Sequence, residues 1–217
     1  MDFAVCLFLI ARGIVPAPNT LDPVLAAIPT LAGALVHRPA SARDPYLNDG
    51  APPDLALQLS FTKVSSLETA CAGPLAALVP LLAGAAVTQQ AMLARPFPVP
   101  DPATLPPEHC TYLVAYDGPA SNLPAWHAHY IAHHPAIMAR FPAIRAIEIY
   151  TALDIANPLP FAHATCMQRN KVVFDSPETL TAALNSPIRH EMRADYATLP
   201  PFTGAVTHYP MRTRRIV

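Results

Sequence analysis

An internal repeat constrains the fold of this chain more than any other feature, because its two halves contain similar segments in the same order. Residues 28–37 (IPTLAGALVH) and 141–150 (FPAIRAIEIY) both open with an apolar residue and a proline, and then alternate as a strand does. Residues 86–95 and 205–214 share Ala, Val, Thr, Met and Arg at the same spacing. Such self-similarity indicates a repeated structural unit.

A third pair of segments, residues 61–78 and 172–189, lies between these in each half and contains a strand end, a Ser-containing cap and a helix. One match could arise by chance, whereas three in order indicate duplication. We therefore expect a first, degenerate unit over residues 1–96 and a second unit over residues 110–217. Between them, residues 97–109 form a Pro-rich linker, which we expect to be stiff and extended.

The second half is predicted to contain four strands and two helices in the order βαββαβ. Either Ser121 or Asn122 can cap the first helix, which runs towards Arg140, and Asp175 or Ser176 can cap the second. The predicted strands are residues 110–118, 143–153, 163–174 and 204–212.

The first half repeats this order with a shorter first helix. The predicted elements are strands at residues 3–11, 31–38, 55–63 and 84–95, and helices near residues 21–29 and from Leu67 onwards. The fold class is thus α+β, with two tandem ferredoxin-like units. Since both helices of such a unit cover one face of its sheet, the other face needs a cover, and two units can cover each other. Whether they do so within one chain or between two chains stays open.

The composition points to extensive burial, because charged residues make up only 13% of the chain. We expect part of the apolar surface to lie in a subunit interface, most simply that of a homodimer. The formal net charge is −1, and the arginines gather only in residues 212–215 (RTRR), so no nucleic-acid partner is expected.

The chain is expected to be cytoplasmic and not to enter a membrane. Its first residues contain Asp2 where a signal peptide needs a basic region, and residues 69–88, although uncharged, contain Pro74 and Pro80. The four cysteines are far apart and form no C-x-x-C pair, so we expect free, buried thiols.

The most distinctive chemistry lies in residues 126–144 (WHAHYIAHHPAIMARFPAI), which contain four of the nine histidines. His129 and His133 are four residues apart on a predicted helix and could share a metal ion. However, no His-Glu-x-x-His motif and no nearby acidic ligand accompany them, and a third ligand would have to come from a distant strand. We therefore expect no metal site.

An acid/base role needs fewer assumptions. Trp126, Tyr130, His133 and Ile137 are spaced to share one helical face, so aromatic residues that pack on the sheet would carry His133 into an apolar cavity. There it could act as a general base or acid, with Tyr130 donating a hydrogen bond to a developing oxyanion. His134 is a further catalytic candidate, expected nearer the rim.

Histidine and cysteine residues on the strands could line the same cavity if they point inwards, which depends on an unknown register. Arg193 and Glu191 are predicted to be solvated charges on the second helix. The candidate substrate-binding residues are Trp126, His129, His163, Cys166 and His208.

Together these residues resemble the EthD-like members of the dimeric α+β barrel superfamily. Trp126, Tyr130 and residues 133–135 (HHP) resemble the aromatic-rich stretch of the family that ends in His-x-Pro. Phe141-Pro142 is similar to its Leu-Pro-Gly entry to the second strand, with alanine where glycine is usual, and residues 174–176 resemble its Phe-x-Ser helix start. The resemblance covers residues 110–212 well and the first half only in outline.

This resemblance implies paired sheets that form a barrel around a cavity, and relatives that include cofactor-free isomerases, metal- and flavin-free monooxygenases and polyketide cyclases. The leading hypothesis from the sequence is a cofactor-free isomerase or lyase that transfers a proton on an aromatic or lactone substrate inside an apolar barrel cavity. A cofactor-independent monooxygenase is the first alternative. A non-catalytic protein that binds a small molecule is the second, because function depends on the site and not on the fold.

Overall fold

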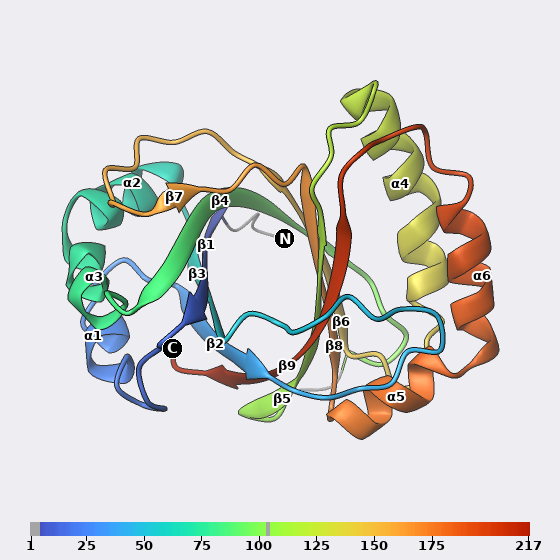
Figure 1. The fold of residues 1–217 in the computed structure, drawn as a ribbon, viewed down its shortest axis with the longest axis horizontal. Coiled ribbons are helices and arrows are strands. Elements are labelled where there is room, and N and C mark those ends of the chain that lie inside the picture. The colour runs from blue at the N-terminus through green and yellow to red at the C-terminus, as the bar shows by residue number, and fades with distance from the viewer. Residues whose placement is uncertain (1–4, 103–104) are drawn as a thin grey trace.

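The computed structural model describes residues 5–102 and 105–217 and shows two βαββαβ units in tandem (Figure 1). The first unit contains β1 (Val5–Gly13), α1 (Asp22–Ala26), β2 (Gly33–Pro39), β3 (Leu55–Phe61), α2 (Val64–Ala72), η1 (Pro74–Ala77), α3 (Leu78–Leu81) and β4 (Ala85–Phe97). The second contains β5 (Glu108–Tyr116), α4 (Leu123–Met138), β6 (Ala146–Ala152), β7 (Ala162–His163), β8 (Gln168–Phe174), α5 (Pro177–Leu184), α6 (Pro187–Tyr196) and β9 (Val206–Arg215). Parts of the predicted first strand and of the predicted linker, residues 3–4 and 103–104, lie outside the described residues.

The two four-stranded sheets join edge to edge and close an eight-stranded antiparallel barrel. β2 pairs with β9 at one seam and β4 pairs with β6 at the other, while β1 pairs with β4 inside the first unit. The short β7 adds to β4 in parallel. The predicted fold class is therefore confirmed, and the two units cover each other within one chain.

The helices pack on the outside of the barrel, with α1, α2 and α3 on the first unit and α4, α5 and α6 on the second (Figure 1). Because side chains alternate along a strand, each strand sends one set to the helices and one set into the barrel. In β8, Val172 and Phe174 pack under the helices, whereas Arg169 lies against the ring of Phe8 in the interior.

The barrel interior is filled mainly by side chains, so the apolar barrel cavity predicted from the sequence is wrong. Large residues from both units meet there, including Phe8, Met92 and Tyr150. A hollow of about 270 Å³, lined by both polar and apolar side chains, remains there beside the ion pair of Lys171 and Glu148. The apolar cavity lies elsewhere, between the outer face of the second sheet and its helices.

Local sequence signals explain how the second-unit helices begin. Asn122 caps α4 by accepting a hydrogen bond from the backbone nitrogen of Ala125 at 3.0 Å. Ser176 caps α5 in a reciprocal capping box with Thr179. The predicted continuous helix after Ser176 is instead two helices, since Ser186 and Pro187 start α6 as a separate segment.

The predicted third strand of the second unit, residues 163–174, is also shorter than expected. β8 covers only the last part of this predicted strand. His163 belongs instead to the separate short strand β7, which pairs with β4. All four cysteines are free and buried, as predicted. Within the described residues, no single helix is long and apolar enough to cross a membrane; only α2 with the segment Pro74–Leu81 passes a length and composition test, as a pair bent by 47°.

Candidate active site

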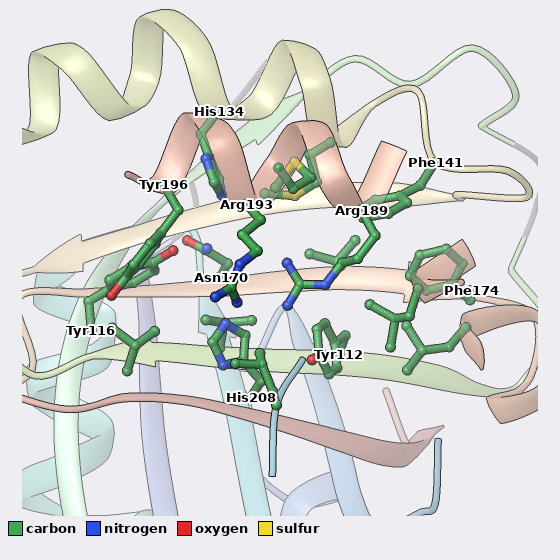
Figure 2. Close-up of a pocket in the computed structure, with 18 of the residues that line it drawn as sticks. Tyr112, Tyr116, His134, Phe141, Asn170, Phe174, Arg189, Arg193, Tyr196 and His208 are labelled. Carbon is green, nitrogen blue, oxygen red and sulfur yellow. The ribbon is translucent and has the colours of Figure 1, made fainter. Parts of the chain in front are cut away.

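A cavity of about 240 Å³ lies between the second-unit sheet and helices α4, α5 and α6 (Figure 2). One end is apolar and the other is polar, as is typical of sites that hold an organic molecule in one orientation. The apolar end is lined by Met138, Phe141, Val172, Phe174, Leu180, Leu184 and Met192.

The inward face of α4 carries Trp126, Tyr130, His134 and Met138, which are buried and spaced four residues apart. Trp126 stacks on Tyr130, with ring centroids 5.1 Å apart, and Tyr130 lies 4.5 Å from the His134 ring. This aromatic stack fixes the rotation of the helix, and His134 is the member of the histidine cluster that reaches the cavity.

The prediction that His133 faces the cavity and His134 the rim is therefore wrong. His133 is exposed and lies against the ring of His129 at 4.6 Å, while His129 hydrogen-bonds Thr198 at 2.9 Å. With 3.6 residues per turn, both a three-residue and a four-residue step from Tyr130 stay near one face. Tertiary packing decides between them, because α6 lies over the His134 side.

His134 is paired with Asp195 of α6, at 2.6 Å between Nδ1 and Oδ2. Burial lowers the pKa of His134, and the hydrogen bond to Asp195 opposes this shift without cancelling it. A neutral imidazole that donates from Nδ1 keeps Nε2 unprotonated. His134 is thus arranged as a proton acceptor at the cavity wall.

A second histidine–carboxylate pair lies at the sheet side of the cavity. His208 of β9 lines the cavity, and both its Nδ1 and its backbone nitrogen donate to Oδ2 of Asp49 at 2.8 Å. The hydrogen bond from His208 lowers the pKa of Asp49, so this carboxylate stays ionised. The sequence left the direction of His208 open; its side chain lies on the outer face of the sheet, where it lines the cavity.

Asp49 comes from the first unit, within residues 40–54, which join β2 to β3 and cross to the helices of the second unit (Figure 1). We call this segment the strap. Its Asp44 accepts hydrogen bonds from Arg189 Nε at 3.0 Å and from the Tyr112 hydroxyl at 3.2 Å, and its Leu47 lines the cavity. The first unit therefore helps to build the site and is more than a structural partner.

Two arginines of α6, Arg189 and Arg193, line the polar end, and both point from the helix towards the sheet (Figure 2). Their guanidinium carbons lie 5.5 and 4.8 Å from the ring centre of Tyr46, another strap residue. Arg193 is exposed, as predicted for a solvated charge, but its side chain also lines the cavity. Asn170 of β8 completes this end.

Tyr130 and Trp126 support the site from behind and do not line the cavity. The Tyr130 hydroxyl accepts a hydrogen bond from Asn170 Nδ2 at 2.7 Å, and burial raises the pKa of Tyr130 well above its ordinary value. His163 is exposed on β7, and Cys166 lies in the barrel interior, where its thiol donates to Gln90 at 2.8 Å. The structure therefore does not bring these two residues, nor His129, to the cavity.

The residues that the sequence did not reveal are Asp44, Asp49, Asp195, Arg189 and Asn170. Each of these residues makes a contact with a distant part of the chain, and the periodic patterns of a sequence do not reveal such contacts. Within the residues that the structure describes, no group of three or more His, Cys, Asp or Glu side chains is placed to hold a metal ion.

No protein-family model matches the chain, and no curated protein matches its sequence. Solved structures match its fold along almost the whole chain. An anthrone oxidase-like protein superposes with a TM-score of 0.64 and 14% identity, covering 100% of this chain and 94% of the other. A protein described as a candidate monooxygenase from Fusobacterium nucleatum has a TM-score of 0.59 and 6% identity, with 98% and 93% of the two chains covered.

A variant of chlorite dismutase from Candidatus Nitrospira defluvii is similar to a lesser degree, with a TM-score of 0.52, 9% identity, and 96% and 91% coverage. At these identities the likeness shows the fold alone. The chain thus has the same tandem α+β barrel fold as these structures, and the chemistry of the site must be argued from its own residues.

Proposed function

We propose that this protein is a monooxygenase that needs neither metal nor flavin and oxidises an aromatic substrate with an acidic C–H group. The observation that carries the proposal is the His134–Asp195 pair at the wall of an otherwise apolar cavity. A neutral histidine there can remove a proton from a bound substrate, and the resulting carbanion can itself react with dioxygen. A cofactor-independent monooxygenase is the first alternative from the sequence. The site now proposed for it is the cavity on the outer face of the second sheet and not the barrel interior.

In the first step, Nε2 of His134 accepts the proton while Asp195 holds the ring and stabilises the imidazolium that forms. General-base catalysis of this kind contributes about 100-fold to 10,000-fold to a rate. The apolar walls exclude water, which strengthens every electrostatic interaction made inside the cavity. Arg193, at the polar end, is placed to stabilise negative charge that spreads onto a substrate oxygen.

In the second step, the carbanion passes one electron to dioxygen, and the two radicals combine to form a carbon–oxygen bond. The peroxide anion that results takes up the proton held by His134 to become a hydroperoxide, which then loses water to leave a carbonyl. The balance is one CH₂ group and one O₂ converted to one C=O group and one H₂O, with no external reductant.

The comparison with an anthrone oxidase-like protein supports this choice of chemistry. Anthrone is a three-ring ketone whose CH₂ group lies between two aromatic rings, so its carbanion is stabilised by delocalisation. A further similar structure is described as a candidate monooxygenase, which agrees with the same class of reaction.

The proposal is tested with an oxygen electrode and anthrone as the probe substrate. The expected result is enzyme-dependent uptake of one O₂ per anthraquinone formed, unchanged by a chelator and by removal of any flavin. The isomerase or lyase expected first from the sequence would use the same base but consume no oxygen. Enzyme-dependent conversion of substrate under strict anaerobiosis would therefore contradict the proposal, as would binding without any product.

A further inference from the structure

The charges that face the cavity are all basic. Arg189 and Arg193 line it, whereas their acidic neighbours Asp44, Asp49 and Asp195 lie behind other side chains and not on the wall. Within the described part of the chain, no Asp or Glu lines the cavity. Basic side chains at one end of a cavity attract a ligand that carries negative charge at the matching end.

The two arginines differ in how they are neutralised. Arg189 forms an ion pair with Asp44 at 2.9 Å, and their side chains are only 13% and 6% exposed. Arg193 has no acidic partner within 4.0 Å among the residues that the structure describes. Its guanidinium group lies over the face of the Tyr46 ring. Arg193 is therefore the group whose charge and hydrogen-bond donors remain available to a ligand.

The strap holds this arginine in place. Tyr46 lies against both guanidinium groups, and its hydroxyl hydrogen-bonds His190 of the same helix. A planar guanidinium that is held over an aromatic ring keeps its edge free to form two parallel hydrogen bonds with a carboxylate. The arrangement is thus built for a planar anion and not merely for any charged surface group.

We propose that the cavity binds an aromatic carboxylate, with its rings against Phe141 and Phe174 at the apolar end and its carboxylate on Arg193. This inference deepens the proposed function, on which it rests in taking the cavity as the substrate site. The volume of about 240 Å³ lies just below the range of roughly 300 to 1,000 Å³ that is usual for drug-sized ligands, so it suits a compact fused-ring acid. The carboxylate also orients the rings relative to His134.

The test is calorimetric titration without turnover, using 2-naphthoate and its neutral isostere 2-naphthamide as probes. The expected result is that naphthoate binds about ten-fold or more tightly than naphthamide, since a hydrogen bond to a charged group contributes on this scale. Arg193→Gln should remove that preference while naphthamide binding stays unchanged. Arg140→Gln, which alters an exposed arginine that pairs with Glu191, is the matched control and should keep the preference.

Equal affinities for the two probes, an absence of naphthoate binding, or an equal loss in both arginine variants would overturn the inference. Tyr46→Leu provides a second route, because freeing Arg193 should weaken naphthoate and spare naphthamide even if Arg193→Gln folds poorly. Oxygen plays no part in the titration. Failure of the monooxygenase proposal would therefore leave this result intact, and the reverse also holds.

Discussion

At the scale of single residues, the chemistry of the candidate site depends on which histidine of the cluster is buried. His134 and His133 are adjacent, yet one is paired with Asp195 inside the molecule and the other is exposed. The sequence predicted the aromatic face of the helix through Trp126 and Tyr130 correctly. It could not predict the side on which α6 would pack, and that contact decides the outcome.

Another buried histidine, His37, should make the stability of the folded protein depend on pH. His37 is fully buried in the barrel interior, where its Nδ1 hydrogen-bonds Thr213 at 2.8 Å, and burial lowers its pKa to about 3. Between about pH 6.5 and pH 3 the unfolded chain binds a proton here and the folded chain does not, so stability falls as the pH falls. The slope is up to about 1.4 kcal/mol per pH unit.

His37→Gln should remove this contribution. We expect urea unfolding curves between pH 6 and pH 4 to show a shallower loss of unfolding free energy with acidification in the variant than in the parent. Carboxylates titrate equally in both proteins and cancel in the difference. Parallel pH profiles would show that His37 is protonated in the folded state.

At the scale of elements, the strap is the part that sequence reasoning missed. It has no periodic pattern and lies between two predicted strands, so no local signal indicates its role. Its role comes from long-range contacts, in which Asp44 pairs with Arg189 and Asp49 with His208. The strands and helices themselves were predictable, because strand alternation and caps such as Ser176 are local signals.

The contacts of the strap predict that breaking its buried ion pair makes it more accessible to a protease. Arg189→Gln should release Asp44 and raise the rate of tryptic cleavage after Arg43 by about ten-fold or more, because breaking a buried ion pair costs several kcal/mol. Glu191→Gln, which breaks an exposed pair with Arg140, is the control and should leave that rate unchanged. Equal cleavage rates in the parent and in Arg189→Gln would show that the strap is held by other contacts.

At the scale of the whole molecule, one chain contains both of the ferredoxin-like sheets that pair to close the barrel. The repeat in the sequence predicted this architecture, and the seams between β2 and β9 and between β4 and β6 close the barrel.

The location of the cavity was not predictable from the sequence, because strand register decides which side chains face the barrel and which face the helices. His208 and Cys166 looked equivalent as strand residues, yet one lines the cavity and the other packs in the interior. A shift of one residue in register would exchange such positions.

The most direct test of the central claim compares His134→Ala with His133→Ala in oxygen uptake with anthrone. Because His134, unlike His133, lines the cavity and pairs with Asp195, its loss should lower turnover by about 100-fold or more, with the melting temperature measured as a check on folding. The His133 variant should keep turnover within about two-fold, as surface substitutions usually perturb a protein little. Equal turnover in the two variants, or a large loss only in His133→Ala, would contradict the account.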